Sequence, residues 1–268
     1  MEPTIAPIQN TVALSSSSQS VPFREDLSGY VLILASVCLA QLGLFFQPQL
    51  GAYLTAGTLA LLMLLAAKYD RVRNVVLVSA IIPLLGMINL TFIQQSAFEQ
   101  TVVLYGAMLI LSIAYRIILR KRTVGAKVHV AWSDYGKYLV GAVFLGTLLG
   151  ILSYKFLATS YVFGGVSILE VAGLAIFGAV SEESFFRGLL QRQASIAMPK
   201  MIAVWYTCLL YITLSLSHFT PWAVAAGLVS TLTLSFFYRK LPSVWLTTAL
   251  NCVSKLVYLG LMAKYIIG

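Results

Sequence analysis

The chain alternates between long apolar runs and short polar or charged segments. From residue 28 onwards, the apolar runs are long enough for an α-helix to cross the hydrocarbon core of a bilayer, which takes about 17–25 residues. Short clusters of Pro, Gly, Gln and charged residues separate them, such as Gln47-Pro48. We therefore expect about eight to nine membrane-spanning helices, near residues 28–47, 50–67, 74–93, 101–119, 137–157, 161–183, 200–218, 221–238 and 243–265.

The composition supports this interpretation. Hydrophobic residues make up 59% of the 268 residues and charged residues only 10%, whereas a soluble domain carries about 25% charged residues. A soluble fold has too little interior to bury so many apolar side chains. The predicted fold class is therefore all-α, a polytopic transmembrane helix bundle that contacts the lipid bilayer directly.

The basic residues are distributed unevenly among the loops. Lys and Arg cluster in every second loop, at Lys68 to Arg73, Arg116 to Lys127, Arg187 to Lys200, and Arg239-Lys240. By the positive-inside rule, these loops and the amino terminus are expected in the cytoplasm. The rule also accounts for the net charge of +9, so we expect no nucleic-acid partner.

The chain divides into three segments. Residues 1–27 are polar, include a run of four serines, and have no basic leader before an apolar core, so a cleaved signal peptide is not expected. We predict a disordered cytoplasmic tail for residues 1–27. We expect accessory transmembrane helices at residues 28–158 and a core that carries the chemistry at residues 159–268.

Two adjacent carboxylates, Glu182 and Glu183, end an apolar run in a chain with only nine acidic residues. An ionisable side chain at membrane depth indicates a functional site by default. Glu183 and Arg187 are four residues apart on a helix, with the acid first, which favours an ion pair. Glu182 points about 100° away around the helix, so it cannot share Arg187 and is free to face a cavity. We therefore assign Glu182 as the general base, and Glu183 and Arg187 as residues that support the motif. The alternative is a solvated helix end at the membrane surface.

Two later polar residues are candidate partners of the acids. His218 closes an apolar run, and a near-neutral imidazole can help a carboxylate to activate water. Thr247, Asn251 and Lys255 are spaced four apart and share one helix face. The amide of Asn251 can donate to an oxyanion, although a polar contact between helices is an equal alternative. The partner of Lys255 stays open between Glu170 and the acidic motif.

The order of these motifs resembles a known family. The segment Glu182-Glu183-Ser-Phe-Phe-Arg187, a histidine closing the next apolar span, and Pro-Ser before a helix with Asn251 are similar to the CAAX protease and bacteriocin-processing family. These intramembrane proteases are also described as type II CAAX prenyl endopeptidases. The resemblance covers roughly residues 160–260.

The resemblance implies a reaction and a set of roles. Glu182 would activate the attacking water with the help of His218, and Asn251 would stabilise the oxyanion. The substrate would be a membrane-anchored peptide or protein, such as a CAAX protein, a bacteriocin or pheromone precursor, or a protein with a C-terminal sorting signal. The expected location is a multi-pass integral protein of the bacterial inner membrane.

One departure from the family pattern is expected to weaken the oxyanion site. Thr247 stands where the family commonly has a second histidine. A threonine hydroxyl can still donate one hydrogen bond, and loss of one oxyanion donor typically costs about 10²–10³ in rate. A catalytically weak or inactive member that binds peptides or confers bacteriocin immunity is the alternative. A transporter with Glu182 as a proton-coupled carboxylate is disfavoured because no inverted repeat is visible.

The ligand set for a metal is incomplete in the sequence. A catalytic zinc usually has three protein ligands and a water, and only His218 and a glutamate are credible here, since His129 lies in a distant loop. We therefore predict a glutamate-type mechanism with no metal or cofactor, and keep zinc as the alternative. Glu182 and His218 would then have to meet, through a long tilted motif helix or an interfacial helix over residues 184–199.

Overall fold

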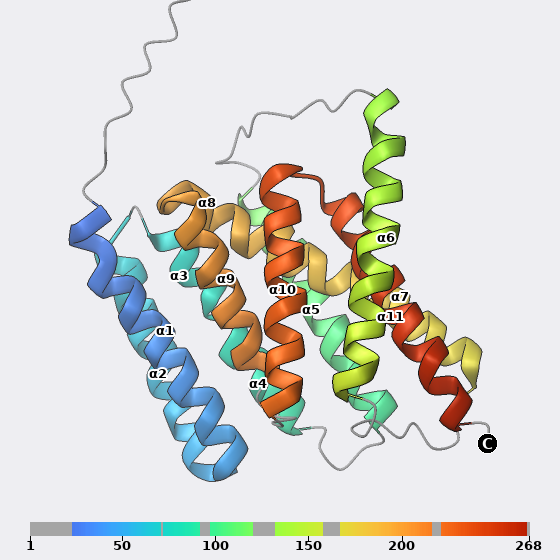
Figure 1. Ribbon diagram of the computed structural model, residues 1–268. Helices are drawn as coiled ribbons and strands as arrows, with labels where there is room; N and C mark the ends of the chain where they lie inside the picture. The colour runs from blue at the N-terminus through green and yellow to red at the C-terminus, as the bar shows by residue number, and fades with distance from the viewer. Residues whose placement is uncertain are drawn as a thin grey trace, which may run out of the picture.

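The computed structural model describes residues 23–70, 72–91, 97–119, 132–157, 167–215 and 221–266. Within these ranges the chain folds into helices joined by short turns, and none of the described residues forms a strand. The predicted all-α bundle is confirmed (Figure 1).

The helices follow the predicted apolar runs closely. Two of those runs form more than one element: the third is broken at Ala80, and the sixth continues well past residue 183. In chain order the helices are α1 (Phe23–Phe46), α2 (Pro48–Lys68), α3 (Arg73–Ser79), α4 (Ile81–Thr91), α5 (Ala97–Leu119), α6 (Trp132–Leu157), α7 (Ile168–Glu182), η1 (Glu183–Gln191), α8 (Arg192–Ala197), α9 (Lys200–Ser215), α10 (Pro221–Lys240) and α11 (Val244–Ile266).

Five of the described helices are long and apolar enough to cross a membrane. They contain the segments Leu27–Phe46, Pro48–Lys68, Phe98–Ile118, Tyr135–Lys155 and Val244–Leu261. Two shorter apolar helical segments, Arg73–Asn89 and Lys200–Leu214, accompany them. Many large apolar side chains on these helices are exposed, among them Ile117, Val140 and Trp245, as expected for a surface that faces lipid.

One end of the bundle is basic. Six helix ends lie together at this end, uppermost in Figure 1: the carboxyl ends of α2, α5 and α10 and the amino ends of α3, α9 and α11. The basic residues near these helix ends are Lys68, Arg73, Arg116, Lys200, Arg239 and Lys240. This arrangement agrees with the alternation of basic loops, and the cytoplasmic location of this end stays a prediction of the positive-inside rule.

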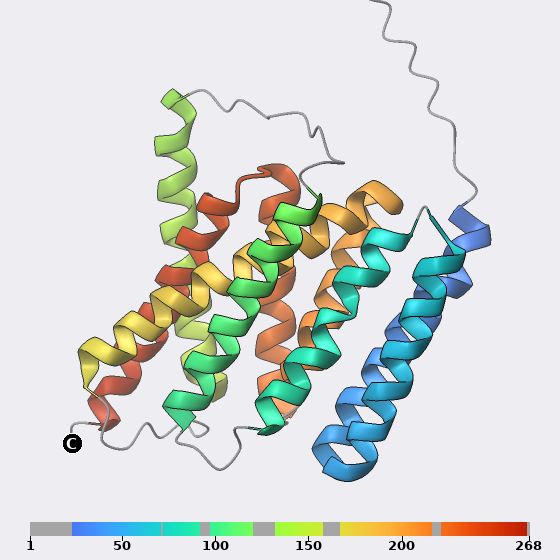
Figure 2. The ribbon, with the colours of Figure 1, turned by 180° about the vertical axis from the view of Figure 1, so that it is seen from behind.

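The acidic motif lies on a long tilted rod. The elements α7, η1 and α8 follow one another without a break and cross the bundle diagonally (Figure 2). The middle element, η1, is a π-helix that spans Glu183–Gln191. Such segments are rare and frequently occur at functional sites. Of the two geometries that the sequence suggested for the motif, the structure has the tilted helix.

Small residues determine how closely the helices of the site approach. A Cβ on Gly146 or Gly150 of α6 would lie 2.6 Å from a backbone carbonyl oxygen of α11. A Cβ on Gly178 of α7 would lie 2.4 Å from the ring of Tyr105 on α5. Glycine lets membrane helices approach closely, and here it brings α6 against α11 and α7 against α5.

The first helix begins earlier than the sequence suggested. Helix α1 starts at Phe23, inside the predicted tail of residues 1–27, and residues 1–22 lie outside the described ranges. The division into an accessory half and a core remains a prediction.

Candidate active site

The ion pair expected from helix spacing is present. Arg187 Nη1 lies 3.2 Å from Oε1 of Glu183, and both side chains are fully buried. Arg187 Nη2 donates to the backbone oxygen and the hydroxyl of Thr231 on α10, at 3.1 and 2.7 Å. Glu183 is therefore held by a cation that is itself fixed between two helices.

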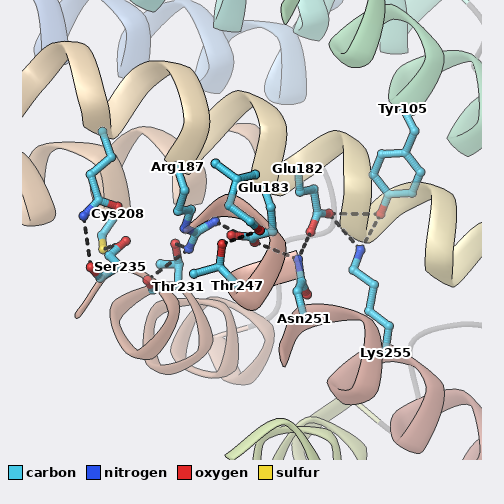
Figure 3. Close-up of polar contacts among 12 residues, drawn as sticks. Tyr105, Glu182, Glu183, Arg187, Cys208, Thr231, Ser235, Thr247, Asn251 and Lys255 are labelled. Carbon is cyan, nitrogen blue, oxygen red and sulfur yellow. Dashed lines mark hydrogen bonds and ion pairs between the residues drawn. The ribbon is translucent and has the colours of Figure 1, made fainter. Parts of the chain in front are cut away.

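Asn251 joins the two acids. Its Nδ2 donates to Oε2 of Glu182 at 3.0 Å and to Oε1 of Glu183 at 2.9 Å (Figure 3). A carboxylate only accepts hydrogen bonds, so the nitrogen of the amide faces both acids. The structure thus brings Glu182 and Asn251 together, 69 residues apart in the sequence, as the motif interpretation required.

Glu182 has a cationic partner of its own. Lys255 Nζ lies 2.9 Å from Glu182 Oε1 and donates to the hydroxyl of Tyr105 at 2.9 Å. The Tyr105 hydroxyl in turn donates to the same Oε1 at 3.0 Å. The structure therefore pairs Lys255 with the motif. Glu170, the other candidate partner, forms a capping box with Ser167 at the start of α7.

Tyr105 is the site residue that the sequence did not reveal. It comes from α5, in the half that we expected to be accessory, and a single tyrosine in an apolar run has no distinctive spacing. Its ring also packs edge-on to Phe177 of α7, with the ring centroids 6.4 Å apart. The hydrogen-bonded cluster therefore draws on both predicted halves of the chain.

Thr247 lies one helical turn before Asn251 and is fully buried. Its hydroxyl donates to backbone oxygens of its own helix, those of Ser243 at 3.3 Å and Val244 at 2.9 Å. Such bonds to the preceding turn are common for threonine in helices. In this state, the hydroxyl is engaged by α11 and not by the carboxylates.

Both histidines of the chain lie outside the described residues. His218 follows the last described residue of α9, Ser215, and precedes Pro221 at the start of α10. Among the described residues, no group of three His, Cys, Asp or Glu side chains is close enough to hold a metal ion. The role of His218 and the choice between a metal-free and a zinc mechanism therefore stay predictions.

Comparison with known protein families identifies the segment that contains the acidic motif and Asn251. Residues 164–257 match the model of the family described as Type II CAAX prenyl endopeptidase Rce1-like. This segment is Rce1-like. The match confirms the resemblance to the CAAX protease and bacteriocin-processing family. It includes both glutamates, Arg187, Asn251 and Lys255, whereas Tyr105 lies outside it.

The five long apolar helices indicate an integral membrane protein, and its segment of residues 164–257 is similar to a family of prenyl endopeptidases. No curated protein and no solved structure matched the chain in the corresponding searches.

Proposed function

We propose that this protein is an intramembrane endopeptidase of the glutamate type. It hydrolyses a peptide bond of a membrane-tethered substrate, with water activated by Glu182. The observation that carries the proposal is the convergence of Glu182, Glu183 and Asn251 in one buried hydrogen-bonded cluster within the Rce1-like segment.

The hydrogen bonds of Glu182 leave room for a water. A carboxylate offers about four acceptor positions, and the described residues use three: two at Oε1, by Tyr105 and Lys255, and one at Oε2, by Asn251. The remaining position lies at Oε2, beside the amide. Both acids have a cationic partner, but the side chain of Glu183 is fully buried whereas that of Glu182 is 9% exposed, so Glu182 is the more accessible base of the two.

The chemistry follows from these positions. Glu182 takes a proton from water, assisted by His218, as the water oxygen attacks the carbonyl carbon of the substrate. The tetrahedral oxyanion accepts hydrogen bonds from Asn251, which gives up one of its bonds to the carboxylates, and from Thr247. The C–N bond then breaks, and the proton passes from Glu182 to the leaving amine.

The substrate would be a membrane-anchored protein or peptide. The candidates are a CAAX protein, a bacteriocin or pheromone precursor, and a protein with a C-terminal sorting signal. The proposed location is the bacterial inner membrane. No metal is required by this mechanism, and zinc held by His218 and a glutamate is the alternative.

A second function is favoured by one observation. The hydroxyl of Thr247 is hydrogen-bonded within its own helix, and Asn251 already donates to both acids. A site whose donors are occupied in this way suits a weak or inactive relative that binds peptides, for instance in bacteriocin immunity.

Substitution of Glu182 by glutamine distinguishes these functions. The change keeps the shape of the side chain but removes the base. We expect cleavage of membrane-anchored test peptides in proteoliposomes to fall by at least about 10³-fold, because both water activation and proton delivery are lost. The matched control is Glu170→Gln on the same helix. The side chain at position 170 is exposed, and a glutamine there can still form the capping box.

Each outcome favours one of the proposed functions or mechanisms. Wild-type cleavage that Glu182→Gln abolishes and Glu170→Gln leaves unchanged supports the endopeptidase. Peptide binding without cleavage by the wild-type protein supports the binding function. Loss of cleavage on treatment with a chelator, restored by added zinc, would replace the metal-free mechanism with the zinc mechanism.

A further inference from the structure

A cavity of about 470 Å³ lies at the basic end of the bundle. It is bounded by the end of α5, by Gly188 and Leu189 of η1, by the start of α8, by the end of α10 and by the first residue of α11. Glu182 and Asn251 are not among the residues that line it. The cavity is therefore separate from the carboxylate cluster.

The polar lining of the cavity is suited to an anion. Two guanidinium groups, those of Arg116 and Arg192, line it together with Gln193 and Tyr238. Among the described residues, neither arginine forms an ion pair with an acidic side chain. Two guanidinium groups in one cavity repel each other unless an anion lies between them, and guanidinium binds phosphate with matched donor geometry.

The apolar lining of the cavity indicates where the ligand comes from. Ile113 and Ile117 of α5 also line it, and these side chains are 49% and 65% exposed. Ile113 lies three residues before Arg116 and Ile117 directly after it, on a helix that is apolar enough to span the membrane. A ligand in this cavity can thus contact two arginines with its head and lipid-facing isoleucines with its body.

We propose that this cavity binds the phosphate headgroup of an anionic phospholipid from the cytoplasmic leaflet. Basic pockets between transmembrane helices on that side are suited to such headgroups. Arg116 and Arg192 hold the phosphate, Gln193 and Tyr238 add neutral hydrogen bonds, and an acyl chain follows Ile113 and Ile117 along α5.

The cavity is connected to the acidic motif through Arg116. Its Nη2 donates to the backbone oxygen of Ser184 at 2.7 Å, directly after the two glutamates. A Cβ on Gly188 would fall onto the same guanidinium, so glycine at this position leaves space for the arginine. Because a guanidinium has five N–H donors, Arg116 can hold Ser184 and a phosphate at once. A bound lipid would thereby stabilise the π-helix that carries Glu183.

The test is a lipid titration of the full-length protein by native mass spectrometry. Purified protein in detergent is titrated with phosphatidylglycerol and, separately, with phosphatidylcholine of the same acyl chains. The variants are Arg192→Gln and the double variant Arg116→Gln/Arg192→Gln. The matched control is Lys240→Gln, an exposed cation at the end of α10 that does not line the cavity.

The proposal predicts that the wild-type protein prefers the anionic lipid and that the arginine variants lose this preference. Wild type retains phosphatidylglycerol over phosphatidylcholine, the affinity for phosphatidylglycerol falls about fivefold for each arginine removed, and Lys240→Gln behaves as wild type. The single variant leaves the bond between Arg116 and Ser184 in place, so it stays informative if the double variant fails to fold. No preference in the wild-type protein, or an equal loss in Lys240→Gln, overturns the proposal.

Two competitors identify the ligand class. Inorganic phosphate at millimolar concentration should displace little phosphatidylglycerol, because the acyl chain contributes to binding; full displacement would reassign the cavity to a soluble phosphate. A short peptide with a free carboxyl terminus should compete no better than its amidated form. Competition by the free acid alone would reassign the cavity to a peptide carboxylate and overturn the lipid site.

Discussion

Lys255 Nζ lies 2.9 Å from Oε1 of Glu182, so the carboxylate proposed as the base is neutralised by a cation from α11. A lone carboxylate inside an apolar bundle is costly, and a partner within hydrogen-bond distance offsets much of that cost. The side chain of Lys255 is 21% exposed and that of Glu182 is 9% exposed. The pair therefore sits at the edge of the buried cluster, with Lys255 on its more exposed side.

Replacement of Lys255 by methionine should destabilise the protein, because Glu182 keeps its charge and loses its cation. We expect a loss of about 2 kcal/mol in the free energy of unfolding, measured by denaturant unfolding in detergent micelles. In a double-mutant cycle with Glu182→Gln, the two changes should couple by more than about 1 kcal/mol. Lys155→Met on α6, an exposed position, serves as the control; additive effects of the first two changes would contradict the pairing.

Replacement of Arg187 by lysine should not be tolerated, although the charge is kept. The guanidinium contacts Glu183 through one nitrogen and Thr231 through another, and an ammonium cannot occupy both positions. We expect about 2–4 kcal/mol of lost stability. Arg192→Lys, on the same rod but exposed, should change stability by less than about 0.5 kcal/mol. Equal stability of the two variants would show that the buried contacts of Arg187 contribute little.

Replacement of Tyr105 by phenylalanine isolates the hydroxyl that links Lys255 and Glu182. The ring and its packing against Phe177 are kept, so the expected loss of stability is only about 1 kcal/mol. If Glu182 is the base, its orientation depends on this hydroxyl, and the variant should have a lower kcat with little change in KM. Tyr53→Phe, at a side chain that is 78% exposed, is the control. Unaltered kcat in the Tyr105 variant would limit the hydroxyl to a structural role.

Two glycines of α7 should respond differently to alanine. A Cβ at position 178 would lie 2.4 Å from the ring of Tyr105, whereas a Cβ at position 173 has nothing within 4 Å. Gly178→Ala should therefore cost about 1–3 kcal/mol through overpacking. Gly173→Ala should be neutral or slightly stabilising, because alanine favours the helix. Thermal unfolding of both variants measures the difference, and similar melting temperatures would argue against the close contact of α5 and α7.

Local geometry explains which parts of the site could be predicted. The ion pair of Glu183 with Arg187 needs only a helical turn, and the shared face of Thr247, Asn251 and Lys255 needs only helical periodicity. Both were therefore predictable from spacing. That Asn251 meets the acids was expected from the order of the motifs, and the structure places it there.

The partners of Glu182 depend on how distant helices cross. Lys255 is 73 residues away and Tyr105 is 77 residues away in the sequence. No local rule selects them among the other polar residues of the apolar runs. The π-helix is equally hidden from sequence patterns, because it depends on packing around the motif and not on residue preference.

By itself, the sequence determined that this chain forms apolar helices, that one end of the bundle is basic, and which acids, amide and arginine belong to the motif. These features follow from the length, composition and spacing of single helices. Only the tertiary structure decided which cation neutralises Glu182, that α5 contributes a hydroxyl to it, and how the motif helix tilts. Those features arise from contacts between helices, where glycines such as Gly178 leave space for a side chain of the neighbouring helix.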